Sequence, residues 1–450
     1  MHFLRPLLRK SLLNWIVVSA ALGVLAPSVV NAEALLVVEA DTGKVLEAQN
    51  ATYPWYPASV TKLMTAYVTL KAVKEGRLSL DTILTVSPVA ASQSPSKMGF
   101  RPGTQVTVDN ALKMMLVKSA NDMAVVLAEG VGGSLDGFSG LMNETAQRLG
   151  MTQTSYVNPN GLPADGQITS ARDLAMLARA IIRDVPEYEY FVHIPSIRFG
   201  RKVTQNFNKL IGRYPGADGF KTGFICASGY NLVASATRNG KRLIAVVLGA
   251  SSGQARAVKA AQLLERGFGN STLSWLRPSL GMVENLVPID ASPPNLRDDM
   301  CGGKRRKPAS DEDEDTVASN LGHTGGETGV TFFAAGLQPP IAKPSELIAG
   351  APAPSEPIPV YTGPTRTGPA LIAAVAADAD KQTSHRAKKT RVAGKKPEAT
   401  PESKNEAKAT ANDVAKHAKP DKKPEPKAVG KPIVDKHANA SPKLAKNPRP

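Results

Sequence analysis

Cysteine and histidine are both scarce in this sequence of 450 residues. Cys226 and Cys301 are the only cysteines, which excludes a disulfide framework. A single bridge would have to join the folded part of the chain to its tail, so we expect two free thiols. Of the six histidines, only His193 lies in the part predicted to be globular, in a strand or loop beside Ile194 and Pro195. With a single histidine in the globular part, the sequence gives little support to a histidine-based catalytic triad or to a zinc hydrolase site.

Aromatic residues are absent from residues 381–450. This segment holds 19 Lys and Arg against 7 Asp and Glu, which accounts for +12 of the net charge of +16. It cannot bury enough apolar surface to fold alone, so we predict a disordered tail rich in Lys, Pro and Ala. Residues 276–380, in which the basic run 304–307 precedes the acidic run 311–315, are predicted to be a low-complexity linker without a core.

Because most of the positive net charge lies in the tail, the basic composition of the protein is no evidence for nucleic-acid binding. We predict no nucleic-acid partner. Export of the chain, which its first 32 residues predict, also argues against a nucleic-acid partner. A basic tail outside the cell would instead attract anionic envelope polymers through screened electrostatics.

The first 32 residues have the pattern of a secretory signal peptide. Arg5, Arg9 and Lys10 precede an apolar run over residues 15–30, and Val30-Asn31-Ala32 then has small residues at the cleavage-type positions. The alternative is an uncleaved membrane anchor, which Pro27 within the apolar run disfavours. In both cases we expect the body of the protein in the periplasm or at the exterior of the cell envelope, membrane-associated if the segment is retained.

Residues 33–275 are predicted to form one domain in which strands flank a helical insertion. A β-hairpin is expected over residues 34–47 and strands over 219–226, 230–237 and 242–249, the last two joined by the turn Asn239-Gly240. Helices are expected over 58–75, 109–118, 122–130, 135–150, 171–183 and 254–268. The predicted fold class is α+β, an antiparallel sheet flanked by helices with an all-helical insertion.

Ser59 and Lys62 lie three residues apart in a run without acidic residues, 53–74, that is typical of a buried helix. Residues at this spacing share a helix face, so the serine hydroxyl and the lysine amine can reach each other. A desolvated lysine that loses its proton can then serve as a base for the serine. The same spacing recurs at Ser94 and Lys97, so the pair alone is weak evidence of a site.

Two further motifs follow in order, Ser119-Ala120-Asn121 between predicted helices and Lys221-Thr222-Gly223 on a predicted strand. Together with Ser59 and Lys62 they resemble the motif set of the serine penicillin-recognising enzymes, which implies a β-lactamase/transpeptidase-like fold. Within that group the sequence resembles the D-alanyl-D-alanine carboxypeptidases, the low-molecular-weight penicillin-binding proteins. The resemblance covers residues 34–268 and includes the segments 57–62, 118–122, 158–162 and 218–223.

The resemblance implies that Ser59 attacks the carbonyl between the last two D-alanines of a peptidoglycan stem peptide, while Lys62 takes its proton. It implies a proton relay through Ser119 to the leaving amine, and an Asn121 carboxamide that holds Lys62 and a substrate amide. The backbone N–H groups of Ser59 and Phe224 would form the oxyanion hole.

The resemblance also implies how the substrate terminus binds. Lys221 and Thr222 would bind the terminal carboxylate, and Gly223 would let the substrate lie against the strand. Arg256 would assist with the carboxylate, the alternative being an ordinary surface arginine at the start of a helix. β-Lactam antibiotics are implied as covalent inhibitors, and no metal or cofactor is required.

Two other functions remain open at this stage, a serine β-lactamase and a non-enzymatic wall-binding protein. A class A β-lactamase uses a glutamate between its second and third motifs to activate water. No glutamate occurs from Thr145 to Pro186, and Asp165 is the only carboxylate of the loop 156–169, where we expect it to be a turn residue. Ile168 stands where relatives often show a histidine, a departure for which the sequence offers no physical reason.

Overall fold

A computed structural model describes residues 33–269, 279–302 and 343–378. The predicted signal peptide, the acidic run 311–315 and the basic tail lie outside the described residues. Within the described ranges, no helix is both long enough and apolar enough to cross a membrane.

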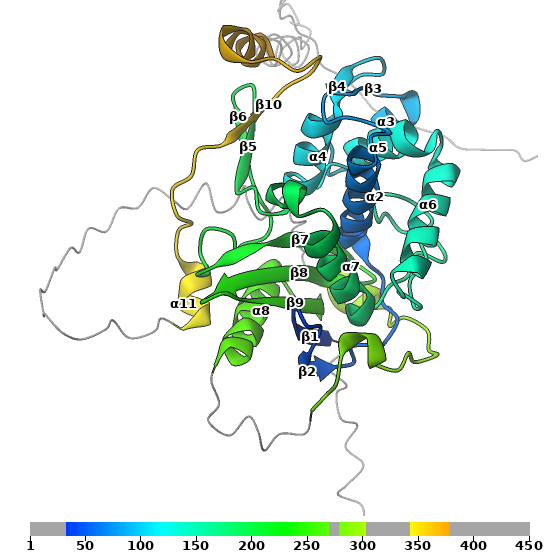
Figure 1. Ribbon diagram of the computed structural model, residues 1–450, viewed down its shortest axis with the longest axis vertical. Helices are drawn as coiled ribbons and strands as arrows, with labels where there is room; N and C mark the ends of the chain where they lie inside the picture. The colour runs from blue at the N-terminus through cyan, green and yellow to red at the C-terminus, as the bar shows by residue number, and fades with distance from the viewer. Residues whose placement is uncertain (1–32, 270–278, 303–342, 379–450) are drawn as a thin grey trace, which may run out of the picture. The chain divides into compact units, whose positions relative to one another are not determined.

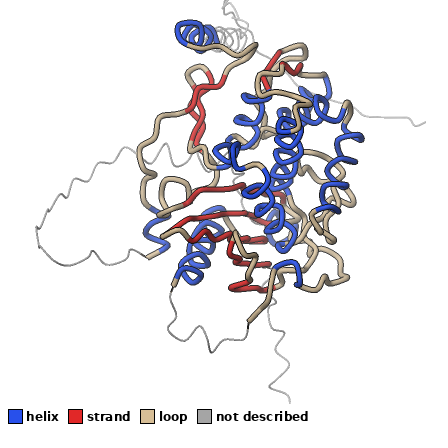
Figure 2. The backbone as a smooth tube through the Cα atoms, in the orientation of Figure 1, coloured by secondary structure: helices blue, strands red, loops and turns tan. Residues whose placement is uncertain are grey.

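The centre of the fold is a five-stranded antiparallel sheet in the order β2-β1-β9-β8-β7 (Figures 1 and 2). The N-terminal hairpin pairs with the C-terminal strands, as the sequence predicts. In this pairing Leu36 of β1 lies opposite Val246 of β9. The strands are β1 (Ala34–Glu39), β2 (Val45–Gln49), β7 (Ala217–Ile225), β8 (Gly229–Arg238) and β9 (Lys241–Ala250).

Both faces of this sheet are covered, which explains why its central strands β1, β9 and β8 are buried over most of their length. Alternate residues of β1 belong to different cores, Leu36 and Val38 to one and Leu35 and Val37 to the other. The second core is closed by α8 (Gly253–Phe268), and the first by α7 (Ala171–Asp184) and the helical insertion.

The insertion between β2 and β7 is mostly helical and is built around α2 (Lys62–Lys74), which is buried on nearly every side. The expected helix over residues 58–75 is divided, because a 3-10 turn, η2 (Ala58–Thr61), precedes α2. Around it lie α3 (Pro88–Ser92), α4 (Val108–Val117), α5 (Asn121–Gly132), α6 (Leu135–Arg148) and η3 (Pro186–Val192), with the short strands β3 (Ile83–Thr85) and β4 (Gln105–Thr107). His193 follows η3 in a loop, as predicted.

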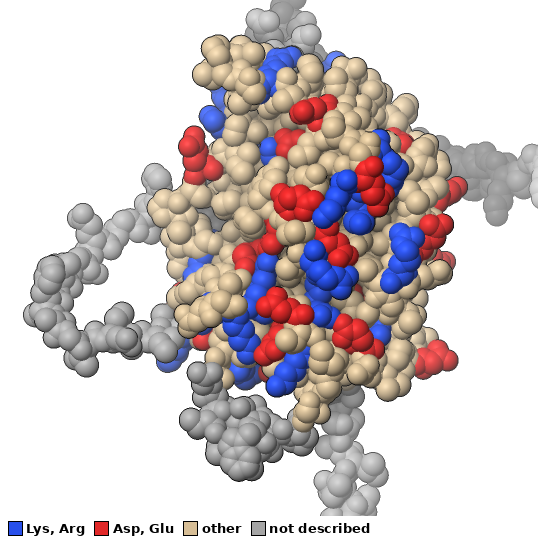
Figure 3. Space-filling model, in the orientation of Figure 1, with Lys and Arg blue, Asp and Glu red and all other residues tan. Residues whose placement is uncertain are grey.

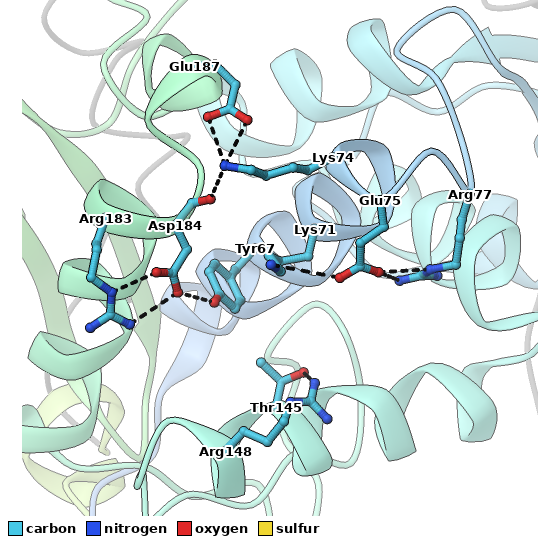
Figure 4. A network of polar contacts seen from close by, with 10 residues as sticks. All are labelled: Tyr67, Lys71, Lys74, Glu75, Arg77, Thr145, Arg148, Arg183, Asp184 and Glu187. Atoms are coloured by element: carbon cyan, nitrogen blue, oxygen red, sulfur yellow. Dashed lines mark hydrogen bonds and ion pairs between the residues drawn. The ribbon is translucent and has the colours of Figure 1, made fainter.

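A polar network fastens the end of α2 to α7 (Figure 4). Tyr67 Oη donates to Asp184 Oδ2 at 2.6 Å, and Lys74 Nζ donates to the Asp184 carbonyl at 2.7 Å. The Arg183 guanidinium lowers the pKa of Asp184, partly opposed by burial, and the Tyr67 hydroxyl lowers it further. This carboxylate therefore stabilises the fold above its unfolded-state pKa, and the contribution is lost as the pH falls through its folded-state pKa.

The prediction that residues 276–380 contribute no core is wrong for the two described segments. Val283 and Val360 are fully buried and Ile348 is 2% exposed, and burying such a side chain contributes about 1.5–3 kcal/mol. Strand β10 (Ile358–Val360) pairs in parallel with β5 (Ser196–Phe199), which also pairs with β6 (Lys202–Gln205) (Figure 1). The other elements are η5 (Val283–Asn285), α9 (Arg297–Cys301) and α11 (Pro344–Ala349).

The expectation of two free thiols is also wrong, because Cys226 and Cys301 form a disulfide. The expectation assumed that Cys301 lies in a linker away from the domain. Instead the segment 279–302 folds back, and the Leu296 amide donates to the carbonyl of Ala227 at 3.0 Å, beside the end of β7. The bridge therefore ties this segment to the strand that carries Lys221 and Thr222.

We predict that Cys226→Ser/Cys301→Ser lowers the free energy of unfolding by about 2–4 kcal/mol, because the bridge closes a long loop in the unfolded chain. The sequence separation of the two cysteines is 75 residues. Urea unfolding of the double variant and of the parent protein, with and without reductant, measures the difference. Equal midpoints for oxidised and reduced parent protein would contradict this.

Candidate active site

Ser59, Ser119 and Asn121 line one cleft of about 150 Å³ together with Phe224, which directly follows the Lys221-Thr222-Gly223 motif. Ser59 comes from η2, Ser119 from the connection between α4 and α5, Asn121 from the start of α5, and Phe224 from β7. The cleft is also lined by residues for which sequence analysis predicts no role, Pro95, Ser96, Gly161, Leu162, Phe207 and Ile225.

The Lys62 side chain is fully buried and surrounded by oxygen atoms. Its Nζ lies 2.8 Å from Ser59 Oγ, 2.7 Å from Asn121 Oδ1 and 2.7 Å from the Asn160 carbonyl oxygen. Burial lowers the pKa of Lys62 well below its usual range, the charge of Lys221 lowers it further, and only Asp122 opposes this. The amine is therefore held towards its neutral form.

A neutral amine satisfies these three contacts without conflict. The oxygens of Asn121 and Asn160 can only accept, so each takes one of the two hydrogens of the amine. The lone pair of the nitrogen then faces Ser59, whose hydroxyl can donate to it. The geometry thus orients Lys62 as a base for Ser59, which the three-residue spacing predicts.

The Ser119-Ala120-Asn121 motif forms a tight connection in which Ser119 adopts a φ of 60°. The Asn121 Nδ2 donates to the Ser94 carbonyl at 2.9 Å, so one of its two N–H bonds already serves the protein. Asp122 accepts from the amides of Met98 and Gly99 at 3.0 and 2.9 Å. The motif therefore also holds the loop 94–99, which forms one wall of the cleft.

Lys221, Thr222 and Gly223 lie on β7 beside η2. Lys221 is 1% exposed, and its Nζ donates to the Thr222 carbonyl at 3.1 Å. The Thr222 hydroxyl is buried, and no described residue forms a hydrogen bond with it. A Cβ on Gly223 would stand 2.7 Å from the Ser59 amide nitrogen, so only glycine allows the strand to approach the turn this closely.

Arg256 is not the surface residue of the alternative interpretation, because it is 2% exposed. Its guanidinium donates to the carbonyls of Asn231 and Phe207 at 3.3 and 3.4 Å and lies over the Tyr230 ring, 5.6 Å from its centroid. Phe207 lines the cleft. Arg256 therefore supports one wall of the site from behind.

Residues 158–167 supply contacts that the sequence did not assign. The Asn160 carbonyl accepts from Lys62, and Gln167 holds this loop in place. Gln167 Oε1 accepts from the amides of Val157 and Asn158 at 2.7 and 3.1 Å, and its Nε2 donates to Thr61 Oγ1 at 3.0 Å. The resemblance includes the segment 158–162, but neither propensity nor periodicity reveals a backbone carbonyl as a lysine partner.

The site combines a serine and a buried lysine on one helical turn, a Ser-x-Asn connection in contact with that lysine, and a Lys-Thr-Gly strand packed against the turn of the serine. These features define a serine acyl-transfer enzyme of the penicillin-recognising class. Comparison with known proteins gives the family. Residues 22–252 match the D-alanyl-D-alanine carboxypeptidases of peptidase family S11, and the chain belongs to this family of serine peptidases.

Curated relatives and solved structures agree with this assignment. D-alanyl-D-alanine carboxypeptidase DacC of Escherichia coli is 42% identical over 271 residues, 58% of this chain and 67% of the relative. DacA of the same organism is 38% identical over 246 residues, and the match covers 53% of this chain and 61% of DacA. The chain thus spans about two thirds of the length of these relatives.

The fold is also similar to that of solved relatives. DacD from Francisella tularensis is 32% identical with a TM-score of 0.52, covering 52% of this chain and 70% of that one. Penicillin binding protein 5 from Haemophilus influenzae is 35% identical with a TM-score of 0.51, covering 54% and 72%. The predicted fold class, the α+β fold of the transpeptidase type, is confirmed.

Proposed function

We propose that this protein is a serine-type D-Ala-D-Ala carboxypeptidase that removes the terminal D-alanine from peptidoglycan stem peptides, and that penicillins acylate it. The observation that carries the proposal is the buried Lys62 amine, whose Nζ lies 2.8 Å from Ser59 Oγ and within hydrogen-bond distance of two acceptor oxygens. Family membership supplies the substrate class.

In the proposed first step Ser59 Oγ attacks the carbonyl carbon between the two D-alanines while its proton passes to Lys62. The backbone N–H groups of Ser59 and Phe224 stabilise the oxyanion of the tetrahedral intermediate. A proton then reaches the leaving amine through Ser119, the carbon–nitrogen bond breaks, and D-alanine leaves. Water attacks the resulting ester, Lys62 takes its proton, and the proton returns to Ser59 Oγ.

The proposed carboxylate site is formed by Lys221 and Thr222 of β7. The Thr222 hydroxyl, which makes no hydrogen bond within the described residues, can donate to a carboxylate oxygen, and Lys221 supplies the charge. Arg256 reaches this end of the site indirectly, by supporting Phe207 and β8. We therefore assign to it a positioning role.

A β-lactamase is disfavoured by the loop that would have to activate water. Asp165 is exposed in a turn of the loop 156–169, as predicted, where its side chain cannot act as a buried base beside the ester. A bulky penicilloyl ester should therefore persist, whereas the smaller peptide ester is open to water.

The proposal also has a cellular part. The predicted signal segment, residues 1–32, would export residues 33–275, the catalytic domain, to the periplasm or envelope exterior. The basic residues 381–450 would hold it near anionic envelope polymers, an attraction that salt weakens. Salt-independent binding to isolated envelopes would contradict that part alone.

The test of the proposed activity is release of D-alanine from a synthetic stem pentapeptide, followed with a D-amino-acid oxidase assay. We expect turnover by the parent protein and none by Ser59→Ala. A folded parent protein that hydrolyses penicillin rapidly and loses this on Asp165→Asn would instead be a β-lactamase. A folded protein active on neither substrate would support the non-enzymatic alternative.

A further inference from the structure

A second and larger cavity, of about 660 Å³, is lined by direct chain neighbours of residues that line the cleft of the candidate active site. It shares two chain segments with the small cleft, since Ser96 and Ser119 line the cleft while their neighbours Lys97 and Lys118 line the cavity. A volume of 660 Å³ is ample for several peptide residues, whereas the cleft of about 150 Å³ is below the usual size of a ligand site. The small cleft is therefore suited only to the end of a substrate.

The lining of this cavity is basic. Lys97, Arg101, Lys118 and Lys202 all line it, against the single carboxylate of Asp378. The carboxylate of Asp378 is within hydrogen-bond distance of the Thr362 amide at 3.3 Å, so it is engaged by its own segment. The cavity therefore favours an anionic ligand.

The cavity also has an apolar wall and a contribution from the segment 343–378. Phe100 and Phe199 pack edge to face with their ring centroids 5.2 Å apart, and both line the cavity. Thr362 and Asp378 complete it, held there by the pairing of β10 with β5 (Figure 1). This segment lies beyond the family match, which ends at residue 252. The cavity is thus partly built by a segment outside that match.

The described face of the domain in Figure 3 shows acidic and basic side chains interspersed, as expected for an ordinary soluble surface. The lining of the larger cavity differs from this pattern, because four cationic side chains there face one carboxylate. Its position next to Ser119 is the second distinguishing feature.

We propose that this basic cavity is a subsite for the part of the stem peptide that precedes the D-Ala-D-Ala end, and that it selects peptides with a free carboxylate there. The proposal rests on the proposed carboxypeptidase function. Exposed Arg101 and Lys202 would attract the carboxylate, and the Phe100 and Phe199 rings would contact the apolar parts of the peptide. Neither cation is needed for the chemistry at Ser59.

Two matched peptides test the subsite on the full chain, one with γ-linked D-glutamate and one with D-isoglutamine at the same position before D-Ala-D-Ala. We expect the parent protein to prefer the carboxylate peptide in kcat/KM, mostly through KM, and to lose the preference at high salt. Arg101→Gln/Lys202→Gln should lower kcat/KM for that peptide by roughly tenfold, since one exposed ion pair contributes about two- to fivefold.

The control variant is Arg148→Gln, which removes a surface charge from α6 whose side chain is 66% exposed. It should leave both peptides unaffected, and the double variant should change the amidated peptide and penicillin acylation by less than about twofold. Release of D-alanine from both peptides with no preference, or an equal loss on both in the double variant, would overturn the subsite alone. If the folded parent protein released D-alanine from neither of the two peptides, the proposed function and the subsite would be overturned together.

Discussion

Lys62→Met lowers the rate of Ser59 acylation by penicillin by about 10²–10⁴-fold, the usual contribution of a positioned general base. Methionine keeps the length and apolar stem of the side chain but cannot accept the proton of Ser59. It also leaves Asn121 Oδ1 and the Asn160 carbonyl without the donor that both have in the parent protein. Stopped-flow measurement with a fluorescent penicillin gives the rate, and circular dichroism checks the fold.

The pH dependence of the parent protein provides the control for this variant. The base must be deprotonated, and burial lowers the pKa of Lys62, with Lys221 adding to the effect. The acylation rate should therefore decrease as the pH falls through the lowered pKa of Lys62, and this decrease should begin below the pH at which an ordinary lysine takes up its proton. In Lys62→Met this decrease of the acylation rate at low pH should disappear. The same decrease in the variant as in the parent protein, or a variant as fast as the parent protein, would exclude Lys62 as the base.

Gly161→Ala lowers the acylation rate by about 100-fold, the typical effect of misplacing reacting groups by about 1 Å. Gly161 has a φ of 81°, and an added Cβ would lie 1.8 Å from the carbonyl oxygen of Ala58, the residue before Ser59. The backbone must move, and with it either the nucleophile or the Asn160 carbonyl that binds Lys62. Acylation kinetics and intact folding measured together separate this effect from unfolding.

Gly166→Ala is the matched control within the same loop. Its φ of 83° imposes the same backbone strain, but the nearest atom to an added Cβ is Val157 Cγ2 at 3.6 Å, an ordinary contact. This variant should lose about 1 kcal/mol of stability or somewhat more from strain and keep its acylation rate within about threefold. Similar kinetic losses at both positions would show that strain, not the contact with Ala58, limits the reaction.

Strong local signals explain which elements the sequence predicts well. The α7 helix, with Ser170 as its N-cap, and the hairpin of β8 and β9 at Asn239-Gly240 have both periodicity and turn chemistry. Their bounds agree with expectation to within one residue. The motif spacing likewise places Ser59 and Lys62 in contact, because a helical turn fixes the distance between them.

Long-range contacts explain the corrections. The partner of Cys226 lies 75 residues away, and it comes into reach only because a segment without periodicity folds back on the domain. Val360 is buried because β10 finds the edge of β5, a pairing for which a three-residue strand carries no sequence signal. Asn160 acts through its backbone carbonyl, and its side-chain type says nothing about that role.

The central claim is that Ser59 is the nucleophile. The most direct measurement is intact-mass spectrometry of the full chain after incubation with penicillin, followed by peptide mapping. We predict one penicilloyl group on the peptide that contains Ser59, persisting for many turnovers of the peptide substrate and absent from folded Ser59→Ala. A penicilloyl group of the same yield on Ser59→Ala would contradict the claim, as would no adduct on a folded parent protein that releases D-alanine.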